Sequence, residues 1–217
     1  LADIGVKVPT IHAENRAEGF LLLSDLGVKS YLDALDVGNA DPLYEGAIET
    51  LLQIQTGASV AGLADYDDAF LIREMEMFVD WFLDRHLGIS LSREQRRIVD
   101  QLFTTLAKSA AEQPQCFVHR DYHSRNLIVA AGNGPGVLDF QDAVAGPITY
   151  DLVSLLKDVY VVWPDTRVHA WKHHYHEHAQ HHGLLAGIDY ERFSSWFDLM
   201  GAQRHLKIPG IFSRLYY

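Results

Sequence analysis

The chain has 217 residues, 48% of them hydrophobic and 22% charged, which suits one or two folded domains with a buried core and does not indicate disorder. Its 29 acidic and 18 basic residues give a formal net charge of −11; such a surface repels phosphate backbones and anionic lipid, so we expect neither nucleic acid nor a membrane as the main partner. The chain has a single cysteine, Cys116, so it can form neither an internal disulfide nor a cysteine zinc site. We see no signal peptide and no apolar run of about 18 residues, and we therefore expect a reducing, cytoplasmic compartment.

The first residues are predicted to be the end of a β-sheet. The apolar run FLLL at 20–23 has the length of a strand, which we expect to be buried, and the turn-forming residues SDLG at 24–27 end it. The chain begins with Leu1 rather than Met, so we expect the natural N-terminus to lie further upstream.

Two helices are predicted next. In the first, Asp41 is a capping residue and Pro42 occupies the first helical position; the helix runs to about Thr56, and Gly57 can end it. The second covers 67–87 and carries apolar residues at helical spacing. This apolar stripe consists of Leu71, Met75, Phe78 and Phe82, widened by Phe70, Met77 and Trp81. We therefore expect the second helix to lie deep in the core.

A third helix is predicted to begin at Ser92. Gln95 follows three residues later, which is the spacing of a capping box. The apolar face of this helix is formed by Ile98, Leu102 and Leu106, with Val99 and Phe103 beside them. We expect these residues to be core residues.

The middle of the chain contains three short apolar runs that predict strands, at 116–119, 127–130 and 136–139. The glycine-rich segment 131–135, which includes Asn133, separates the last two and predicts a hairpin turn. Helices are expected again after Pro147. The pattern is therefore α+β, with small hairpins that carry polar residues between helices.

Polar residues gather on the loops of these central hairpins. Residues 119–126 read HRDYHSRN, which has the spacing H-R-D-x-x-x-x-N, and an apolar strand follows at once. Asp139 comes thirteen residues after Asn126, at the end of another strand. A lone Asp-x-x-x-x-Asn is commonplace in solvated loops, but two linked elements at this spacing are far less expected by chance.

This arrangement has the groups that phosphoryl transfer requires. Asp121 is the candidate base, because it can meet the acceptor hydroxyl from a position separate from the metal. Asn126 and Asp139 are the candidate Mg²⁺ ligands, because this hard cation prefers oxygen donors. We expect the loop and the following hairpin to bring Asp121, Asn126 and Asp139 together at one site.

The segments HRDYHSRNL and LDFQDAVAGPITYDLVSLL resemble the aminoglycoside phosphotransferase and choline kinase superfamily, which shares the protein-kinase fold. The FQDA, GPITYDL and FDLMGAQRHLK stretches look most like the bacterial anomeric N-acetylmuramate and N-acetylglucosamine sugar kinases of cell-wall recycling. The resemblance implies Mg²⁺ and ATP as cofactors and a small sugar as the acceptor. It also implies a mostly helical lower lobe, residues 28–217, and a remnant of the upper nucleotide-binding lobe and hinge, residues 1–27.

Carried over by position, the resemblance assigns a role to each candidate site residue. It makes Asp121 the catalytic aspartate and Asn126 and Asp139 the metal ligands. Nucleotide contacts are implied at Leu23, Asp25, Asn126 and Asp139. Acceptor contacts are implied at Asp121, His123 and Arg204. Structural support is implied at His119, Asp142 and Asp151. Two alternatives stay open: Asp151 can simply cap a helix, and Arg204 with His205 can do the same.

The usual phosphate-binding elements of a kinase are not visible in this sequence. It contains neither a G-x-G-x-x-G loop nor a Val-Ala-Ile-Lys-like strand, and Lys7 lies in a segment where the family has a turn, so we do not interpret it as the phosphate lysine. We expect the glycine-rich loop, the lysine and its glutamate partner upstream of Leu1.

One further cluster stands out in the last third of the chain. It consists of His173, His174, His176, His178, His181 and His182. On a helix His174 and His178 share a face, as do His178 and His182, so zinc is geometrically conceivable, but incidental histidines on an exposed helix are favoured. Trp163, Trp171 and Trp196 could stack on a sugar, but core positions are favoured for them.

Three other functions remain as alternatives to a sugar kinase. The first is an aminoglycoside or choline phosphotransferase, which the acidic surface would suit. The second is a non-catalytic kinase-like binding module. The third, ranked last, is a histidine-based metal-binding protein. The sequence leaves open the sugar, its hydroxyl, the choice between ATP and GTP, and the oligomeric state.

Overall fold

The computed structural model describes residues 1–132 and 134–217. The elements in the first half are η1 (Ala2–Ile4), β1 (Ile11–Asn15), β2 (Phe20–Leu23), α1 (Tyr31–Ala34), α2 (Ala40–Gly57), β3 (Ala64–Asp65), α3 (Asp68–Met77) and the π-helix η2 (Phe78–His86). Those in the second half are α4 (Arg93–Ala111), β4 (Gln115–Val118), β5 (Leu127–Ile128), β6 (Gly136–Val137), β7 (Val144–Pro147), α5 (Thr149–Leu156), α6 (Asp165–His181) and α7 (Tyr190–Tyr216).

Three small sheets are set among these helices. β1 pairs with β2 and β5 pairs with β6, both antiparallel, whereas β7 lies between β3, to which it is parallel, and β4, to which it is antiparallel. Strands at 115–118, 127–128 and 136–137 confirm the three predicted runs, the first shifted by one residue and the other two shortened. β7 and β3 were not predicted. The predicted turn at 131–135 includes Asn133, which lies outside the described residues.

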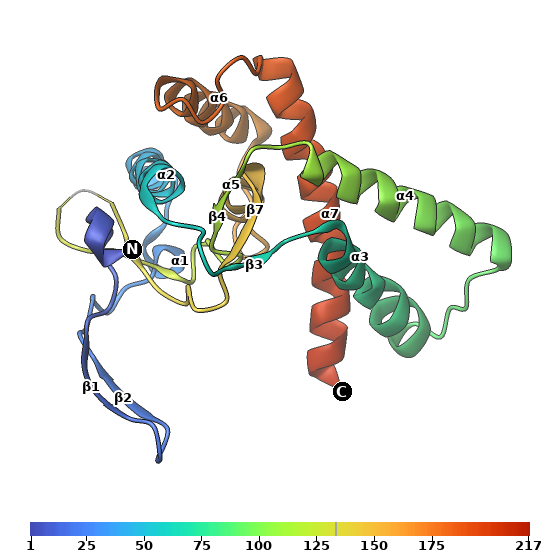
Figure 1. Ribbon diagram of the computed structural model, residues 1–217, viewed down its shortest axis with the longest axis horizontal. Helices are drawn as coiled ribbons and strands as arrows, with labels where there is room; N and C mark the ends of the chain where they lie inside the picture. Colours follow the sequence, from blue (N-terminus) through green and yellow to red (C-terminus); the bar gives the residue numbers. More distant parts are fainter. Residues whose placement is uncertain (133) are drawn as a thin grey trace.

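α7 is the helix around which the rest is arranged. It contacts η2, α3, α4 and α5, and in Figure 1 it runs beside the central strands while α3 and α4 extend away on one side. Gly210 permits the close approach to the end of α3, because a Cβ there would lie 2.4 Å from the carbonyl carbon and oxygen of Met77. The main core lies between α2, α5, α6, the central strands and the first half of α7.

The β1–β2 hairpin projects from this body (Figure 1). Phe20–Leu23 forms the predicted strand, but the expectation that it is buried is wrong, because all four residues are exposed and β1 is its only partner among the described strands. Residues 1–8 behave differently and pack on the helical body. Val6 is buried in the main core, and the Lys7 carbonyl accepts a hydrogen bond from the Val137 amide at 2.8 Å.

The helix ends largely follow the predicted signals. Ser92 and Gln95 form a capping box, and Asp67 caps α3 by accepting from the Phe70 amide at 2.7 Å. The first predicted helix is confirmed as α2, but it begins at Ala40, before Asp41.

Two expectations about burial are wrong. The helix predicted at 67–87 is continuous, but its second half is the π-helix η2, none of whose residues is fully buried. On α4, Ile98 and Leu102 are 53% and 45% exposed, whereas Phe103 and Leu106 are buried. The buried face of α4 therefore follows Phe103, Leu106 and Ala110, which is about a quarter turn from the predicted stripe.

Trp171 and Trp196 are both 3% exposed, so the interpretation of these residues as core residues is confirmed. Trp171 stacks on Tyr44 with ring centroids 4.1 Å apart, and Trp163 donates its indole N–H to the Tyr44 hydroxyl.

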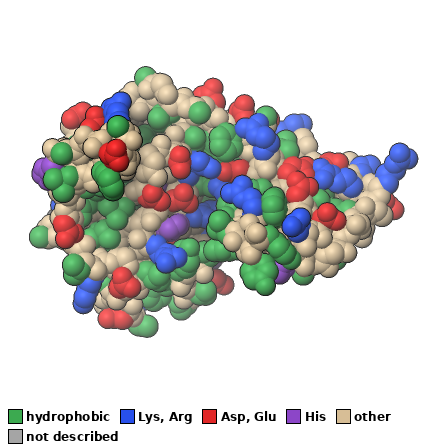
Figure 2. All heavy atoms as spheres, turned by 90° about the horizontal axis from the view of Figure 1, so that it is seen from below, with side chains coloured by type: hydrophobic (Ala, Val, Ile, Leu, Met, Phe, Trp, Pro, Cys, Tyr) green, Lys and Arg blue, Asp and Glu red, His purple; other side chains and the backbone are tan. Residues whose placement is uncertain are grey.

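The face of the molecule in Figure 2 carries charges of both signs. In the view from below, acidic and basic side chains are interspersed with exposed hydrophobic ones (Figure 2). Among the described residues, no helix combines the length and the hydropathy needed to cross a bilayer.

Candidate active site

The loop at 119–126 connects β4 to β5, and the next hairpin strand, β6, leads directly to Leu138 and Asp139. The Leu138 amide donates to the Asn126 carbonyl at 3.0 Å, which extends the pairing of β5 with β6 by one step. The structure therefore brings the catalytic-loop sequence and the Asp139 segment side by side, as the spacing predicted.

His119 joins these two segments from the inside. It is fully buried, its Nε2 lies 2.8 Å from the Leu138 carbonyl, and its Nδ1 lies 3.3 Å from the Asp121 amide. An amide can only donate, so Nδ1 accepts and Nε2–H donates to Leu138. Burial lowers the pKa of His119, which favours the neutral ring that this pattern needs.

Asn126 is oriented by the same loop. Its side-chain Nδ2 donates to the Asp121 carbonyl at 3.0 Å, which leaves the amide oxygen as the free acceptor. Asp139 is exposed, and its Oδ1 accepts from Gln141 Nε2 at 2.8 Å. An amide oxygen and a carboxylate on adjacent segments match the oxygen donors that Mg²⁺ prefers, so the residues present fit the implied metal.

The backbone is strained at two points of this site. Arg120 has φ +77° and Asp139 has φ +66°, and among the described residues no other non-glycine residue has positive φ. Such conformations cost about 1–3 kcal/mol each and persist only where the surroundings hold them. Both residues adjoin the candidate chemistry.

Asp151, in the first turn of α5, holds the strained loop. Its carboxylate accepts from the His119 amide at 2.6 Å and from the Arg120 amide at 3.0 Å, and the residue is completely buried. Its side chain therefore reaches the catalytic loop. Burial raises the pKa of Asp151 to about 7, although these two amides and the positive charge of Arg204 act in the opposite direction.

This raised pKa gives a testable pH dependence. The pKa of Asp151 in the folded state lies above the 3.8 that is usual for an aspartate, so between these two values the folded state binds a proton that the unfolded state releases. The contribution of Asp151 to stability is therefore fully present at low pH and is lost as pH rises toward 7. Between about pH 4.5 and 6.5, we expect the free energy of unfolding of the wild type to fall relative to Asp151→Asn by up to about 1.4 kcal/mol per pH unit.

Urea unfolding of both proteins across this range measures the difference. Other titrating groups, including His119, are common to both proteins and cancel in the comparison. Parallel pH profiles would contradict the assignment.

Arg120 is held on its other side by Glu74 of α3, a residue that the sequence analysis missed. Glu74 is 5% exposed, and its Oε1 lies 2.7 Å from both Arg120 and Lys207 of α7. Tyr66 donates to its other oxygen. Burial would raise the pKa of Glu74, but Lys207, Tyr66 and Arg120 outweigh it and lower the pKa. The signal was present in the sequence, because Glu74 interrupts the apolar face between Leu71 and Met75.

A second missed residue is Asp158, just after α5. Its Oδ2 accepts from both the amide and the hydroxyl of Ser124, and its Oδ1 accepts from the Tyr160 amide at 3.0 Å. His123 and Tyr160 meet edge to face with ring centroids 5.6 Å apart, and Nδ1 of His123 is buried without a hydrogen-bond partner. Burial lowers the pKa of His123, so a neutral ring is favoured.

The other predicted site residues lie further from this centre. Arg204 is 5% exposed on α7 and donates to Ser154 Oγ at 2.6 Å. Arg204 lies in the middle of α7 and does not cap that helix. Nε2 of His205, by contrast, lies 3.2 Å from the Lys157 carbonyl at the end of α5, so the interpretation of His205 as a helix cap holds. The backbone carbonyl of the exposed Asp142 accepts a hydrogen bond from the Arg120 side chain at 3.4 Å.

The predicted hinge runs along the outside of the β5–β6 hairpin. Leu23 ends β2 and is 45% exposed, and Asp25 accepts from the Gly27 amide at 2.9 Å. Further on, the Lys29 carbonyl accepts from the Val129 amide at 2.9 Å. Lys7 contacts the same hairpin and donates to the Ala131 carbonyl at 2.8 Å.

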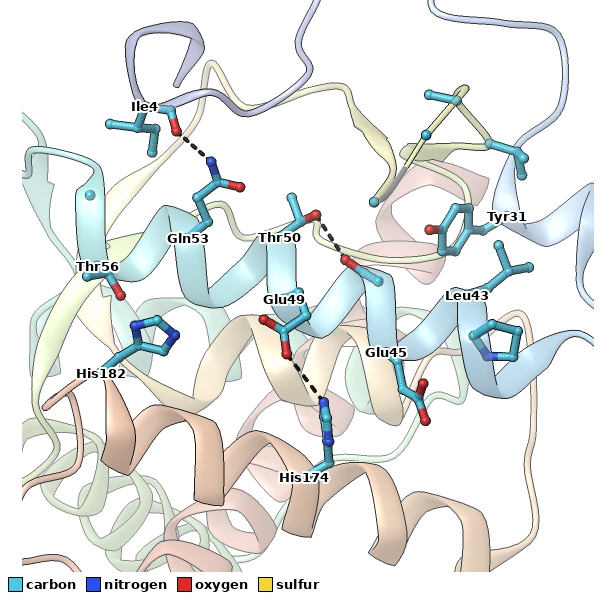
Figure 3. Close-up of a pocket in the computed structure, with 17 residues that line it drawn as sticks. Ile4, Tyr31, Leu43, Glu45, Glu49, Thr50, Gln53, Thr56, His174 and His182 are labelled. Atoms are coloured by element: carbon cyan, nitrogen blue, oxygen red, sulfur yellow. Dashed lines mark hydrogen bonds and ion pairs between the residues drawn. The ribbon is translucent and has the colours of Figure 1, made fainter.

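A large cavity lies elsewhere. It has a volume of about 1000 Å³ and lies between α2, α6 and the end of β5 (Figure 3). Its described lining does not include Asp121, Asn126 or Asp139. The candidate catalytic residues are therefore not part of the described lining of this cavity.

Comparison with solved structures defines the class of fold. A type VIII aminoglycoside-3'-phosphotransferase matches with a TM-score of 0.61 and 13% identity over 94% of this chain and 76% of that one. The GDP complex of a mutant aminoglycoside 2'-phosphotransferase-IIIa matches with a TM-score of 0.64 and 14% identity over 100% of this chain and 71% of that one. The chain therefore has the protein-kinase-like fold of these enzymes, and the predicted α+β class is confirmed.

The family follows from sequence. The model of the phosphotransferase enzyme family matches residues 1–192, and the chain belongs to this family. It is 50% identical over 216 residues to the N-acetylmuramate/N-acetylglucosamine kinase of Pseudomonas aeruginosa and 47% identical over 215 residues to that of Pseudomonas putida. These alignments include 99% of this chain and 63% of each relative. The predicted resemblance is confirmed, and the chain spans slightly less than two thirds of the length of these relatives.

Proposed function

We propose that the full-length protein containing this chain is a magnesium- and ATP-dependent sugar kinase. It transfers the γ-phosphoryl group to a hydroxyl of a small sugar, namely the anomeric hydroxyl of N-acetylmuramate or N-acetylglucosamine. The observation that carries the proposal is the H-R-D-x-x-x-x-N loop, which is hydrogen-bonded to the Asp139 segment in a chain half identical to a kinase of that name. An ATP-dependent reaction of this kind belongs in the cytoplasm.

In this proposal Asp121 accepts the proton of the acceptor hydroxyl. It stands on the strained loop that Asp151 and His119 hold in place. Asn126 and Asp139 hold Mg²⁺, which, when bound, neutralises charge on the nucleotide phosphates. The hydrogen bond from Asn126 Nδ2 to the Asp121 carbonyl supports these separate roles for Asp121 as the base and Asn126 as a metal ligand. It directs the side-chain oxygen of Asn126 away from Asp121.

The remaining residues take supporting roles in the proposal. Leu23 and Asp25 on the hinge contact the nucleotide, and His123 contacts the sugar. Arg204 is buried, so in this proposal it supports acceptor binding indirectly. It does so through its hydrogen bond to Ser154 and through its positive charge, which favours the ionised form of Asp151. Residues 1–27 belong to the nucleotide-binding lobe and 28–217 to the helical lobe.

A substrate panel tests the function. We expect the full-length protein to phosphorylate N-acetylmuramate and N-acetylglucosamine far better than choline or kanamycin in a coupled assay of ATP consumption with Mg²⁺. A preference for kanamycin or choline would support the aminoglycoside or choline phosphotransferase alternative. Mg²⁺-nucleotide binding with no turnover on any acceptor would favour a binding module.

A further inference from the structure

Two histidines of α6 and one glutamate of α2 converge at the edge of the cavity between these two helices. His174 and His178 are four residues apart and lie on the same face of α6, with their ring centroids 4.0 Å apart. Glu49 reaches toward them from α2, and Figure 3 shows its carboxylate pointing at His174 across the gap between the two helices. One ligand atom from each of the three residues lies within 4.8 Å of the others.

The distances are those of ligands around a metal and not of hydrogen bonds. Glu49 Oε1 lies 3.5 Å from His174 Nε2 and 3.6 Å from His178 Nε2, at or beyond the limit for a hydrogen bond. Ligands about 2.0–2.1 Å from a tetrahedral zinc ion are separated from one another by about 3.4 Å. The carboxylate oxygen therefore lies at nearly the separation from both nitrogens that a shared zinc ion would require.

The hydrogen bonds of the two rings fit this arrangement. His178 Nδ1 lies 2.8 Å from the His174 carbonyl, which can only accept, so Nδ1 carries the proton and Nε2 presents a lone pair. A backbone carbonyl that fixes the tautomer of a ligating histidine is typical of metal sites. His174 Nε2 is buried and has no hydrogen-bond partner, although it faces the carboxylate.

An ordinary ion pair explains these contacts less well. Two protonated imidazoles so close together would repel, and one carboxylate oxygen placed between two nitrogens makes no good hydrogen bond with either. A cation in this position would satisfy all three groups at once. The side chain of Glu49 is 51% exposed, so water can reach a fourth position.

We propose that Glu49, His174 and His178 form a zinc site with water as the fourth ligand. The site links α2 to α6. It is separate from the candidate kinase chemistry, and it does not rest on the proposed function. Two nearby histidines are engaged elsewhere: His176 contacts the Ile188 carbonyl at 3.1 Å, and His173 lies beside Tyr190.

The test is zinc titration of the full-length, tag-free protein after treatment with a chelator. We expect one equivalent of zinc to bind with micromolar or tighter affinity, measured by calorimetry and by competition with a chromophoric chelator. His174→Ala, His178→Ala and Glu49→Gln should each weaken zinc binding by at least about 10–100-fold, the loss usual even for second-shell partners of a metal ligand. His181→Ala and His182→Ala are matched controls from the same histidine cluster and should bind zinc like the wild type.

A second measurement requires no variant. Cobalt(II) added to the wild type should give the intense visible absorption of a tetrahedral site, and zinc should abolish it at one equivalent. The proposal is overturned if the wild type binds zinc only weakly, if cobalt gives only an octahedral spectrum, or if His181→Ala or His182→Ala loses the zinc while His174→Ala retains it.

Discussion

We expect Asp121→Asn in the full-length protein to lower kcat by about 10²–10⁴-fold, the usual range for the loss of a general base. Asn preserves the size of the side chain and leaves the Asp121 carbonyl in place to accept from Asn126. Nucleotide affinity should stay nearly unchanged, because Asp121 is proposed to meet only the acceptor hydroxyl. An interaction made mainly in the transition state lowers kcat and kcat/KM together, and steady-state kinetics with the sugar measure both.

Asp139→Ala is the matched comparison. Asp139 is proposed to hold Mg²⁺, so this variant should lose Mg²⁺-nucleotide affinity as well as turnover. Calorimetric titration of Mg²⁺-nucleotide into both variants separates the two roles. If Asp121→Asn loses nucleotide binding while Asp139→Ala retains it, the two assignments are reversed.

The second large effect concerns stability. We expect Glu74→Gln to lower the free energy of unfolding by about 3–5 kcal/mol, because it leaves the cations of Arg120 and Lys207 without their buried carboxylate. Lys207 would keep the Tyr150 hydroxyl at 3.1 Å as a hydrogen-bond partner, but it would lose the negative charge of Glu74. Urea unfolding of the full-length protein measures the loss.

Glu76→Gln is the control on the same helix. Glu76 pairs with Arg96 nearer the surface, where the two side chains are 26% and 39% exposed, and such pairs contribute about 1 kcal/mol or less. Equal losses in the two variants would show that the buried network around Glu74 contributes no more than a surface pair.

The local signals in the sequence predicted what depends on local chemistry. The capping box at Ser92 and the stop near Gly57 are encoded within a few residues, and the structure has both. The H-R-D-x-x-x-x-N spacing placed Asp121 and Asn126 on one loop, and the hairpin that follows could be read from its glycines. These features needed no knowledge of distant neighbours.

What could not be predicted depends on partners that are distant in sequence. β7 reads as a short stretch of small residues, and only its pairing with β3 and β4 makes it a strand. Ile98 and Leu102 have helical spacing, but the positions of α3 and α7 decide which face of α4 is buried. Glu49 meets the histidine cluster only because α2 and α6 pack together.

Several of the hydrogen bonds that hold the loop at 119–126 involve main-chain groups. Asp151 binds two amides, His119 binds a carbonyl, and Asn126 binds the Asp121 carbonyl and accepts from the Leu138 amide. The side chains at 123 and 125 do not take part in these bonds. If the protein is the proposed kinase, a mutant library confined to those two positions would vary what the loop presents to an acceptor while leaving these main-chain hydrogen bonds intact, which makes them starting points for engineering acceptor preference.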